Sequence, residues 1–206
     1  MDKSNNELWK KILLALSCSK RKIILSKNQA KKGHHELNSL KINSDSVLGS
    51  IILNSSGIIV DDWIRILGSE GTDNKGILWY NKILEIENMT MIAHDIIGGI
   101  FAIDNFNEIW YFAPDTLEWE NLDINYAQFI NWVLEGDIDL FYNTMRWNSW
   151  ENDCKNVKFD EGILIYPFLW SNEMEINEAS KKVVPIEELF FINQESANMI
   201  SDNDIL

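Results

Sequence analysis

The sequence predicts an α+β fold with a central antiparallel, meander-rich β-sheet and flanking helices. Between Met91 and Leu122, four short apolar or alternating runs are separated by turn-forming residues, which is the pattern of a β-meander. Amphipathic helical patterns lie on both sides of this stretch, at residues 5–17 and 125–135. A chain of 206 residues with 46% hydrophobic content can bury about 70% of its unfolded surface, which suffices for one core.

The N-terminal part of the chain is interpreted as one helix followed by short strands. Apolar residues recur at helical spacing over residues 5–17, so this helix should pack its apolar stripe on the sheet. A helical turn is predicted at 28–32, ended by Gly33. Short apolar runs predict strands at residues 23–25, 47–53, 57–60 and 63–67.

The meander supplies the centre of the predicted sheet. Its strands are expected at Ile92–Asp95, Ile100–Asp104, Ile109–Ala113 and Leu117–Asn121. In the last strand two apolar residues alternate with Glu118 and Glu120, which predicts one buried and one wet face. Just before the meander, residues 77–87 fit either a short helix or an irregular edge strand.

Helices are predicted again after the meander. The apolar side of residues 125–135 ends at Gly136, a typical helix stop. Asp137 should cap a second helix, whose apolar stripe leads into Trp147 and Trp150 on one helix face. Large aromatic residues in such a position are more often core or lid than ligand platform.

The last quarter of the chain contains one predicted strand and one predicted helix. The strand is Gly162–Phe168, and Pro167 favours an edge position. A polar, acidic loop is expected up to Lys182, followed by a helix over residues 186–195. We expect a single domain over residues 1–198, with residues 199–206 as a flexible tail.

Charge is distributed unevenly along the chain. Residues 1–45 carry ten Lys or Arg against four Asp or Glu, a basic N-terminal region of helix and strand. Residues 46–206 carry eight against 28, a net charge of −20. Such an acidic body repels nucleic-acid phosphates and steers basic partners towards it, although charge also serves solubility alone. Whether the basic region folds back on the acidic body is left open.

The sequence predicts a cytoplasmic protein without a membrane span. The apolar patch after Lys10-Lys11 is too short for the hydrophobic region of a secretion signal, and no later segment reaches 18 apolar residues. Cys18 and Cys154 lie far apart and outside any metal or redox spacing, so both are expected to be reduced. The oligomeric state is not predicted.

No catalytic, metal or cofactor signature is complete. His34-His35-Glu36 is interpreted as an exposed loop because adjacent histidines point apart and no third ligand is evident. The GxxxxG spacing of residues 71–76 lacks the Lys and Ser/Thr of a phosphate loop. His94 could act as a base beside Asp95, but adjacent strand residues face opposite sides of a sheet, so their side chains should not pair.

Several long motifs resemble those of a bacterial family called domain of unknown function 2625. The resemblance extends from about Ile23 to Leu189 and rests on the stretches Ser46–Ser50, Trp63–Ser69, Asp95–Ala102, Tyr111–Glu120 and Phe141–Trp147. A more distant likeness is to the SMI1/KNR4-like, or SUKH, superfamily, whose α+β members include immunity proteins that neutralise bacterial toxins. This likeness implies a SUKH-like fold and is an analogy at the level of architecture.

Two of the three arginines, Arg65 and Arg146, fall inside these motifs. Because a guanidinium makes bidentate pairs that lysine cannot copy, each is expected to hold one of the carboxylates Asp95, Asp115, Glu118 and Glu120. A purely structural ion pair is the alternative. The candidate binding residues are completed by Trp119, Trp147 and Trp150, the last two as the roof of a polar pocket.

The predicted function is that of a non-enzymatic protein-binding module that uses an acidic face. Its partner would be a basic protein such as a toxin, and the protein would then act as an immunity protein. The alternative is a small-ligand-binding protein or hydrolase with a pocket around Arg65, Arg146 and Trp147 or Trp150. No catalytic residue, metal ligand or cofactor is assigned.

Overall fold

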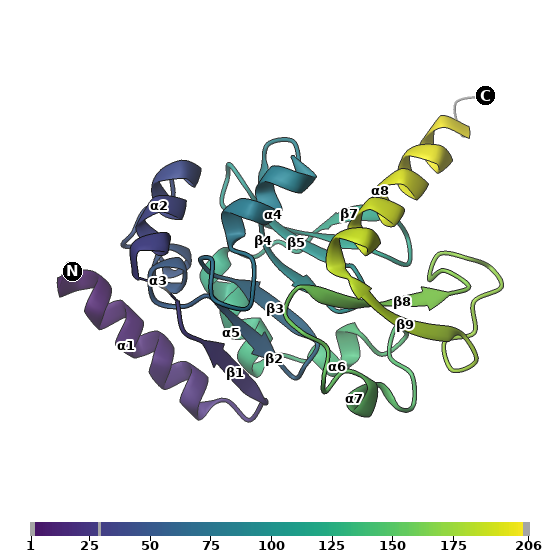
Figure 1. Cartoon of the computed structure of the whole chain (residues 1–206), viewed down its shortest axis with the longest axis horizontal. Helices are drawn as coiled ribbons and strands as arrows, with labels where there is room; N and C mark the ends of the chain where they lie inside the picture. Colours follow the sequence, from purple (N-terminus) through teal and green to yellow (C-terminus); the bar gives the residue numbers. More distant parts are fainter. Residues whose placement is uncertain (1–2, 29, 204–206) are drawn as a thin grey trace.

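The computed structural model describes residues 3–28 and 30–203 and contains two antiparallel sheets. The larger sheet has seven strands in sequence order, so every strand pairs with its neighbour along the chain (Figure 1). This confirms the α+β class and the central antiparallel sheet. The strands are β1 (Ile23–Ser26), β2 (Gly57–Val60), β3 (Ile64–Leu67), β4 (Met89–Asp95), β5 (Ile100–Asp104), β6 (Ile109–Ala113) and β7 (Glu118–Asn121).

The prediction of a strand at residues 47–53 is wrong, because this segment forms helix α3 (Val47–Asn54). Ser46 caps the helix: its Oγ accepts a hydrogen bond from the Gly49 N–H at 2.9 Å. Five consecutive residues of α3, 48–52, are buried. A continuous apolar run fits a buried strand or a buried helix equally well, so periodicity could not separate them.

Helix α2 (Ala30–Leu40) replaces the helical turn and loop expected around Gly33. Gly33 does not end the helix; it brings α2 close to α3, and a Cβ there would lie 2.8 Å from the Ile52 carbonyl oxygen. His34 and His35 are exposed on α2, whereas Glu36 is buried. The expected exposed loop at these three residues is therefore corrected to a helix.

The remaining helices follow the predicted order with different bounds. They are α1 (Lys3–Cys18), α4 (Ile77–Leu84), α5 (Tyr126–Glu135), α6 (Ile138–Phe141), α7 (Trp150–Asp153) and α8 (Ile186–Asn203). α1 packs on α3. The segment 77–87, for which the sequence allows a helix or an edge strand, contains helix α4. The second predicted helix breaks after Phe141, so Trp147 and Trp150 do not share a helix face. Residues 199–203 continue α8, while 204–206 lie outside the described residues.

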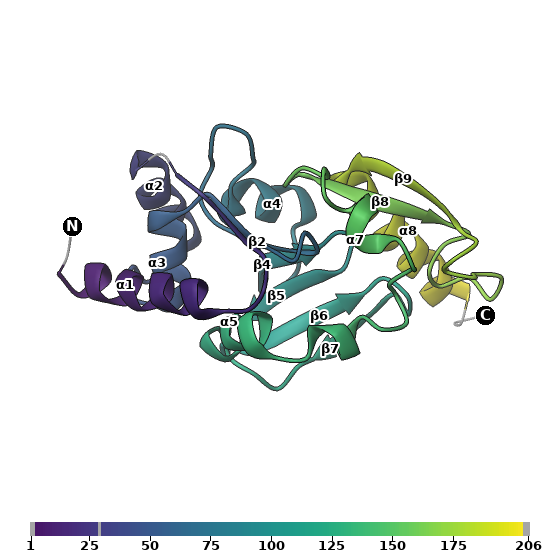
Figure 2. The same cartoon turned by 90° about the horizontal axis from the view of Figure 1, so that it is seen from below.

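The second sheet is a hairpin of β8 (Glu161–Tyr166) and β9 (Ser180–Pro185). β8 was predicted, but β9 lies partly in the stretch expected as a polar loop. Two lysines give β9 the composition of a polar loop, so the sequence does not predict it as a strand. An exposed edge strand tolerates such charged residues. The hairpin and α8 lie at one end of the molecule, and α1–α3 lie at the other (Figure 1, Figure 2).

Aromatic contacts show which helices cover each face of the large sheet. Phe101 on β5 contacts Phe129 of α5, with ring centroids 5.0 Å apart. His94 on β4 contacts Tyr80 of α4 and Phe190 of α8, at 5.5 and 5.7 Å. Phe101 pairs with the residue next to His94, so the two side chains lie on opposite faces. α5 therefore covers one face, and α4 with α8 covers the other.

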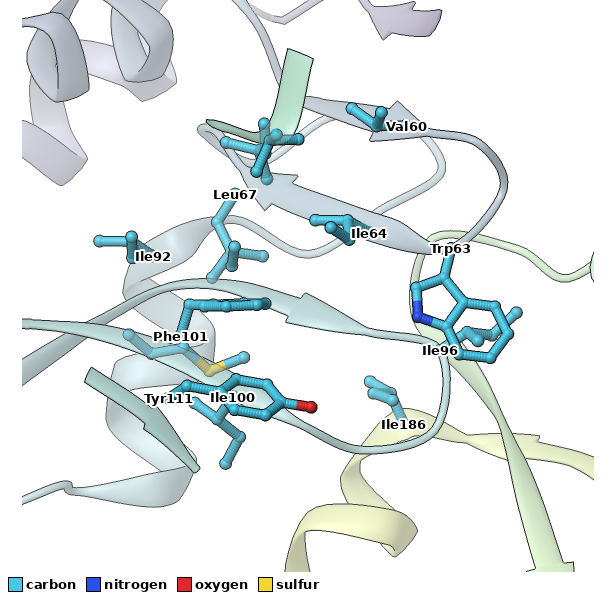
Figure 3. Packing of buried hydrophobic residues seen from close by; sticks show 14 of the residues in the cluster. Val60, Trp63, Ile64, Leu67, Ile92, Ile96, Ile100, Phe101, Tyr111 and Ile186 are labelled. Atoms are coloured by element: carbon cyan, nitrogen blue, oxygen red, sulfur yellow. The ribbon is translucent and has the colours of Figure 1, made fainter. Parts of the chain in front are cut away.

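The core is continuous across these layers. Figure 3 shows buried side chains of β2 and β3, such as Val60 and Ile64, in the same cluster as Phe101 of β5 and Tyr111 of β6. Ile186, the first residue of α8, joins the same cluster and is fully buried. The meander and the C-terminal helix thus share one core.

Replacing Asn125 by Ala should lower the free energy of unfolding by about 1 kcal/mol. Asn125 begins α5 with a capping box, in which its Oδ1 accepts from the Gln128 N–H at 3.1 Å and Gln128 Oε1 accepts from the Asn125 N–H at 2.9 Å. Urea denaturation measures the change. Asn131→Ala, at an exposed position in the same helix, is the control and should not destabilise. Equal losses in both variants would contradict the role of the cap.

Candidate functional site

A fully buried carboxylate, Asp95, lies at the end of β4 and gathers four hydrogen-bond donors. Its Oδ1 accepts from the N–H groups of Ile97 and Gly99, at 3.0 and 2.8 Å. Its Oδ2 accepts from the hydroxyls of Tyr111 and Tyr142, at 2.8 and 3.1 Å. Burial raises the pKa of Asp95, and the four hydrogen bonds counteract this by stabilising the carboxylate.

The Gly98-Gly99 pair is explained by the same carboxylate. Gly98 has a φ of +94°, which side chains rarely adopt. A Cβ at Gly99 would overlap the Asp95 carboxylate and the Tyr111 hydroxyl. The motif around Asp95 therefore has a structural purpose, which is to close the turn from β4 to β5 around a buried charge.

Arg65 does not hold any of the expected carboxylates. On β3 it pairs with His94, whereas Asp95 pairs with Ile64, so Arg65 and Asp95 face opposite sides of the sheet. The Arg65 guanidinium is fully buried and donates to the carbonyl oxygens of Asp62, Trp63 and Val157, at 2.7, 3.0 and 3.4 Å. Burial lowers its pKa to about 10. Its role in the structure is to tie three backbone segments together.

His94 and Asp95 are both buried, and their side chains do not bond to each other, as predicted. The His94 Nδ1 lies 3.1 Å from the Asp95 main-chain oxygen, which identifies Nδ1 as the protonated nitrogen because a carbonyl only accepts. Its Nε2 is buried without a partner among the described residues. Burial, reinforced by the charge of Arg65, lowers the pKa of His94 to about 3. A histidine that stays neutral and has no exposed surface is poorly placed to act as a general base.

Arg146 lies in a box of aromatic rings. Its guanidinium carbon is 4.0 Å from the ring centroid of Trp150, 4.9 Å from Trp63 and 5.5 Å from Tyr142. It pairs with Asp139, which was not among the expected partners. The Arg146 side chain is 7% exposed, and its Nε and one terminal nitrogen are buried without partners in the described part of the chain.

Of the two tryptophans expected to roof a pocket, only Trp150 is partly exposed. Trp147 is buried, and its indole N–H donates to Asp153 at 2.6 Å. Both tryptophans contact Trp63, at 5.9 and 5.3 Å between ring centroids. Together with Trp63 and Arg146 they form a packed aromatic cluster, which Arg65 joins only through its hydrogen bond to the Trp63 carbonyl oxygen.

The other expected binding residues lie elsewhere, at the β7 edge of the large sheet. Glu118 and Glu120 are exposed on β7, and Trp119 between them is half-buried against Phe112. Asp115 is half-buried in the turn before β7, with an Oδ1 that has no partner among the described residues. The predicted binding residues therefore do not form one site: Arg65 lies on one face of the sheet, Asp95 lies on the other, and Glu118 and Glu120 are exposed on β7.

Glu108 and Asp123 extend the exposed acidic strand. The Asn121 side chain donates to Glu108 at 2.7 Å, which places Glu108 beside the end of β7. Asp123 is exposed just beyond the strand. We refer to Glu108, Glu118, Glu120 and Asp123 as the acidic edge.

The basic N-terminal region pairs with a different part of the acidic body. Arg21 binds Asp61 at 2.8 Å, and Lys22 binds Asp62 at 2.6 Å, both at the turn between β2 and β3. Lys32 binds Glu70 at 2.8 Å. Arg21 also lies 3.7 Å from Asp139. Within the described residues, no ion pair involves the acidic edge.

The structure adds several negative findings about the described residues. No group of three His, Cys, Asp or Glu side chains there could hold a metal ion. None of the helices in that part of the chain combines the length and the hydropathy needed to cross a bilayer. Both cysteines are free, and Cys154 is buried, which raises the pKa of its thiol to about 12.

Sequence reasoning did not identify four residues that organise the buried cluster. They are Trp63, Tyr111, Tyr142 and Asp139. The first three lie inside the long motifs, so the motifs themselves were the available signal. Asp139 precedes Arg146 by seven residues, a spacing that indicates no contact unless the break after α6 is known.

Comparison with known proteins matches residues 2–189 to the family described as "Protein of unknown function DUF2625". The chain belongs to this family. Putative uncharacterized protein YbfG of Escherichia coli (strain K12) is 33% identical over 162 residues, which are 73% of this chain and 74% of the relative. An uncharacterized protein of Haemophilus influenzae (strain ATCC 51907 / DSM 11121 / KW20 / Rd) is 29% identical over 185 residues, or 82% of this chain and 81% of the relative.

No solved structure matches the chain. The family resemblance seen in the motifs is thus confirmed, whereas the likeness to the SUKH superfamily stays a prediction. The family is described as one of unknown function, so the function must be argued from the molecule itself.

Replacing His94 by Leu should change how stability depends on pH. Because the folded-state pKa of about 3 lies below the unfolded value of about 6.5, the unfolded state alone binds this proton between those pH values. The free energy of unfolding of the wild type should therefore fall with decreasing pH, by about 1.4 kcal/mol per pH unit from this residue.

His94→Leu removes this contribution, so the variant should gain stability relative to the wild type as the pH falls from about 7 to about 4.5. Urea denaturation at several pH values measures the difference, and the Asp95 contribution cancels because both proteins contain it. His34→Leu, on the exposed side of α2, controls for the loss of a histidine. Parallel pH profiles for wild type and His94→Leu would refute the prediction.

Replacing Arg146 by Lys should lower the free energy of unfolding by about 2 kcal/mol, because lysine lacks the planar guanidinium that lies against Trp63 and Trp150. Asp139→Asn removes the ion pair at a carboxylate whose side chain is 70% exposed, so it should cost less than about 1 kcal/mol. Thermal and urea unfolding compare the two variants. A larger effect from Asp139→Asn would show that the ion pair, not the aromatic box, holds Arg146.

Proposed function

We propose that the protein is a non-enzymatic binding module whose acidic edge engages a basic protein, as an immunity protein engages a basic toxin. The supporting observation is the charge of residues 83–154, which contain 14 Asp or Glu and a single Lys or Arg, Arg146. Arg146 is buried in the aromatic box and paired with Asp139, so it does not neutralise the surface. The field around β7 therefore stays negative and would attract a basic partner.

The acidic edge also carries residue types that anchor protein interfaces. Trp119 on β7 and Trp110 on β6 are both half-buried, and the indole N–H of Trp110 donates to Asp104 at 3.2 Å. Partly exposed tryptophans surrounded by polar residues are frequent hot spots of protein binding. Glu118 and Glu120 point to the face opposite Trp119 and Trp110, so a partner that covers this edge would meet an aromatic anchor on one face and selectivity for a basic surface on the other.

Strand β7 offers backbone groups as well as side chains. In the described part of the chain it pairs with β6 alone, so its outer edge is unpaired. An exposed edge strand can accept a strand from a partner, while its glutamates oppose pairing with a second acidic copy. The ion pairs of the N-terminal region lie at Asp61, Asp62 and Glu70, which keeps the acidic edge unmasked.

Reversing charge at Glu118, Glu120 and Asp123, each to Lys, should abolish binding of the partner. The control replaces Glu173, Glu175 and Glu178, which are also exposed, by Lys and produces the same change in net charge. Tagged proteins are used to capture partners from the lysate of the native host at low and high salt, and retained proteins are identified by mass spectrometry. We expect one basic protein that binds wild type and control, and is lost at high salt and from the acidic-edge variant.

Two outcomes would contradict the proposal. The first is a partner that the acidic-edge variant retains as well as the wild type. The second is the absence of any stoichiometric protein while native mass spectrometry shows a bound small molecule. In the second case Arg146→Lys would show whether that molecule depends on the aromatic box.

A further inference from the structure

A cavity of about 510 Å³ lies where helices α3 and α5 begin, beside the turn from β5 to β6. This volume is within the range that small ligands fill, about 300–1,000 Å³. Polar uncharged side chains make up much of its wall, and they include Asn43, Ser46, Thr90, Asn105, Asn107 and Asn125. None of these residues belongs to the acidic edge or to the aromatic box.

The chemistry of this wall favours an uncharged ligand. Charged residues make up 24% of the chain, whereas Asp104 is the one charged residue that lines this cavity. Its carboxylate already accepts hydrogen bonds from the N–H groups of Phe106 and Glu108, both at 2.9 Å, and from the Trp110 indole at 3.2 Å. The charge therefore serves the β5–β6 turn, and it would repel an anion drawn to the two helix starts.

Several polar groups of the wall are not used within the described chain. The side chains of Thr90, Asn105 and Asn107 make no hydrogen bond there. Tyr126, which also lines the cavity, has a buried hydroxyl without a partner among the described residues. The side chains of Thr90, Asn105 and Asn107 are therefore the open polar groups that a ligand could reach, whereas the Tyr126 hydroxyl has no accessible surface.

A second cavity shows the contrast. It has a volume of about 330 Å³ and lies between the β2–β3 turn and α7. In its wall Arg21 is paired with Asp61 and Lys22 with Asp62, so these polar groups are already satisfied. The first cavity, called here the uncharged cavity because Asp104 alone among its lining residues is charged, differs in that the side chains of Thr90, Asn105 and Asn107 keep their hydrogen-bonding capacity.

We propose that the uncharged cavity binds a neutral polyhydroxylated ligand of the class of a mono- or disaccharide. An asparagine amide presents a donor and an acceptor side by side, which matches neighbouring hydroxyls that both donate and accept. The apolar side chains of Val47, Leu48 and Ile103 line the same cavity and suit the C–H surface of a sugar ring. The site does not depend on the proposed protein partner.

The test is an NMR titration of the full-length protein with glucose, N-acetylglucosamine and maltose, with inorganic phosphate as the anionic comparison. Ala127 is exposed near the start of α5 and lines the cavity, so Ala127→Trp should fill it, and Ala127→Ser is the matched control. We expect at least one of the sugars to shift the side-chain amide signals of Asn105 and Asn107 in wild type and Ala127→Ser. Its affinity should be about tenfold weaker in Ala127→Trp.

The proposal is overturned if none of the three sugars shifts these signals, if the shifts persist unchanged in Ala127→Trp, or if phosphate produces the same shifts. Should Ala127→Trp fail to fold, Asn105→Ala in the exposed β5–β6 turn replaces it. That variant should weaken the sugar-induced shift at Asn107 without loss of thermal stability. An unchanged titration of Asn105→Ala would also overturn the proposal.

Discussion

The buried carboxylate of Asp95 sets the arrangement of the central part of the molecule. Its four donors come from the β4–β5 turn, from Tyr111 on β6 and from Tyr142 after α6. A carboxylate taken out of water without such partners would be strongly destabilising, so these segments must meet at one point. Tyr142 also forms one side of the aromatic box around Arg146, so this one residue contacts both Asp95 and Arg146.

The two faces of the sheet carry separate polar clusters for a simple geometric reason. Asp95 and His94 are neighbours on β4, so one lies under α6 with the tyrosines and the other lies with Arg65 against α4 and α8. Positive charge at Arg65 and a neutral histidine share the second face. Asp95, His94 and Arg65 are all fully buried, so neither cluster presents these side chains to solvent.

The elements that the sequence predicts correctly are those whose signal lies in neighbouring residues of the chain. The four meander strands and the capped helix α5 were predicted because turn residues and caps are encoded in neighbouring positions. Helix α3 was not, because a buried apolar run has no period to distinguish helix from strand. The partners of Arg65 and Arg146 depend on strand register and on the chain break after Phe141, which only tertiary structure defines. Glu118 and Glu120 of the acidic edge were among the predicted binding residues, but Glu108 was not, and neither was the separation of this edge from the arginines.

The strand order has a consequence for how the protein reaches its structure. From β4 to β7 each strand is joined to the next by a short turn, so these pairings close small loops and lose little chain entropy. Pairing β1 with β2 and β3 with β4 requires closing longer segments that contain α2, α3 and α4. Assembly is therefore expected to begin in the meander and to add the N-terminal strands later, with the Asp95 turn already formed when they arrive.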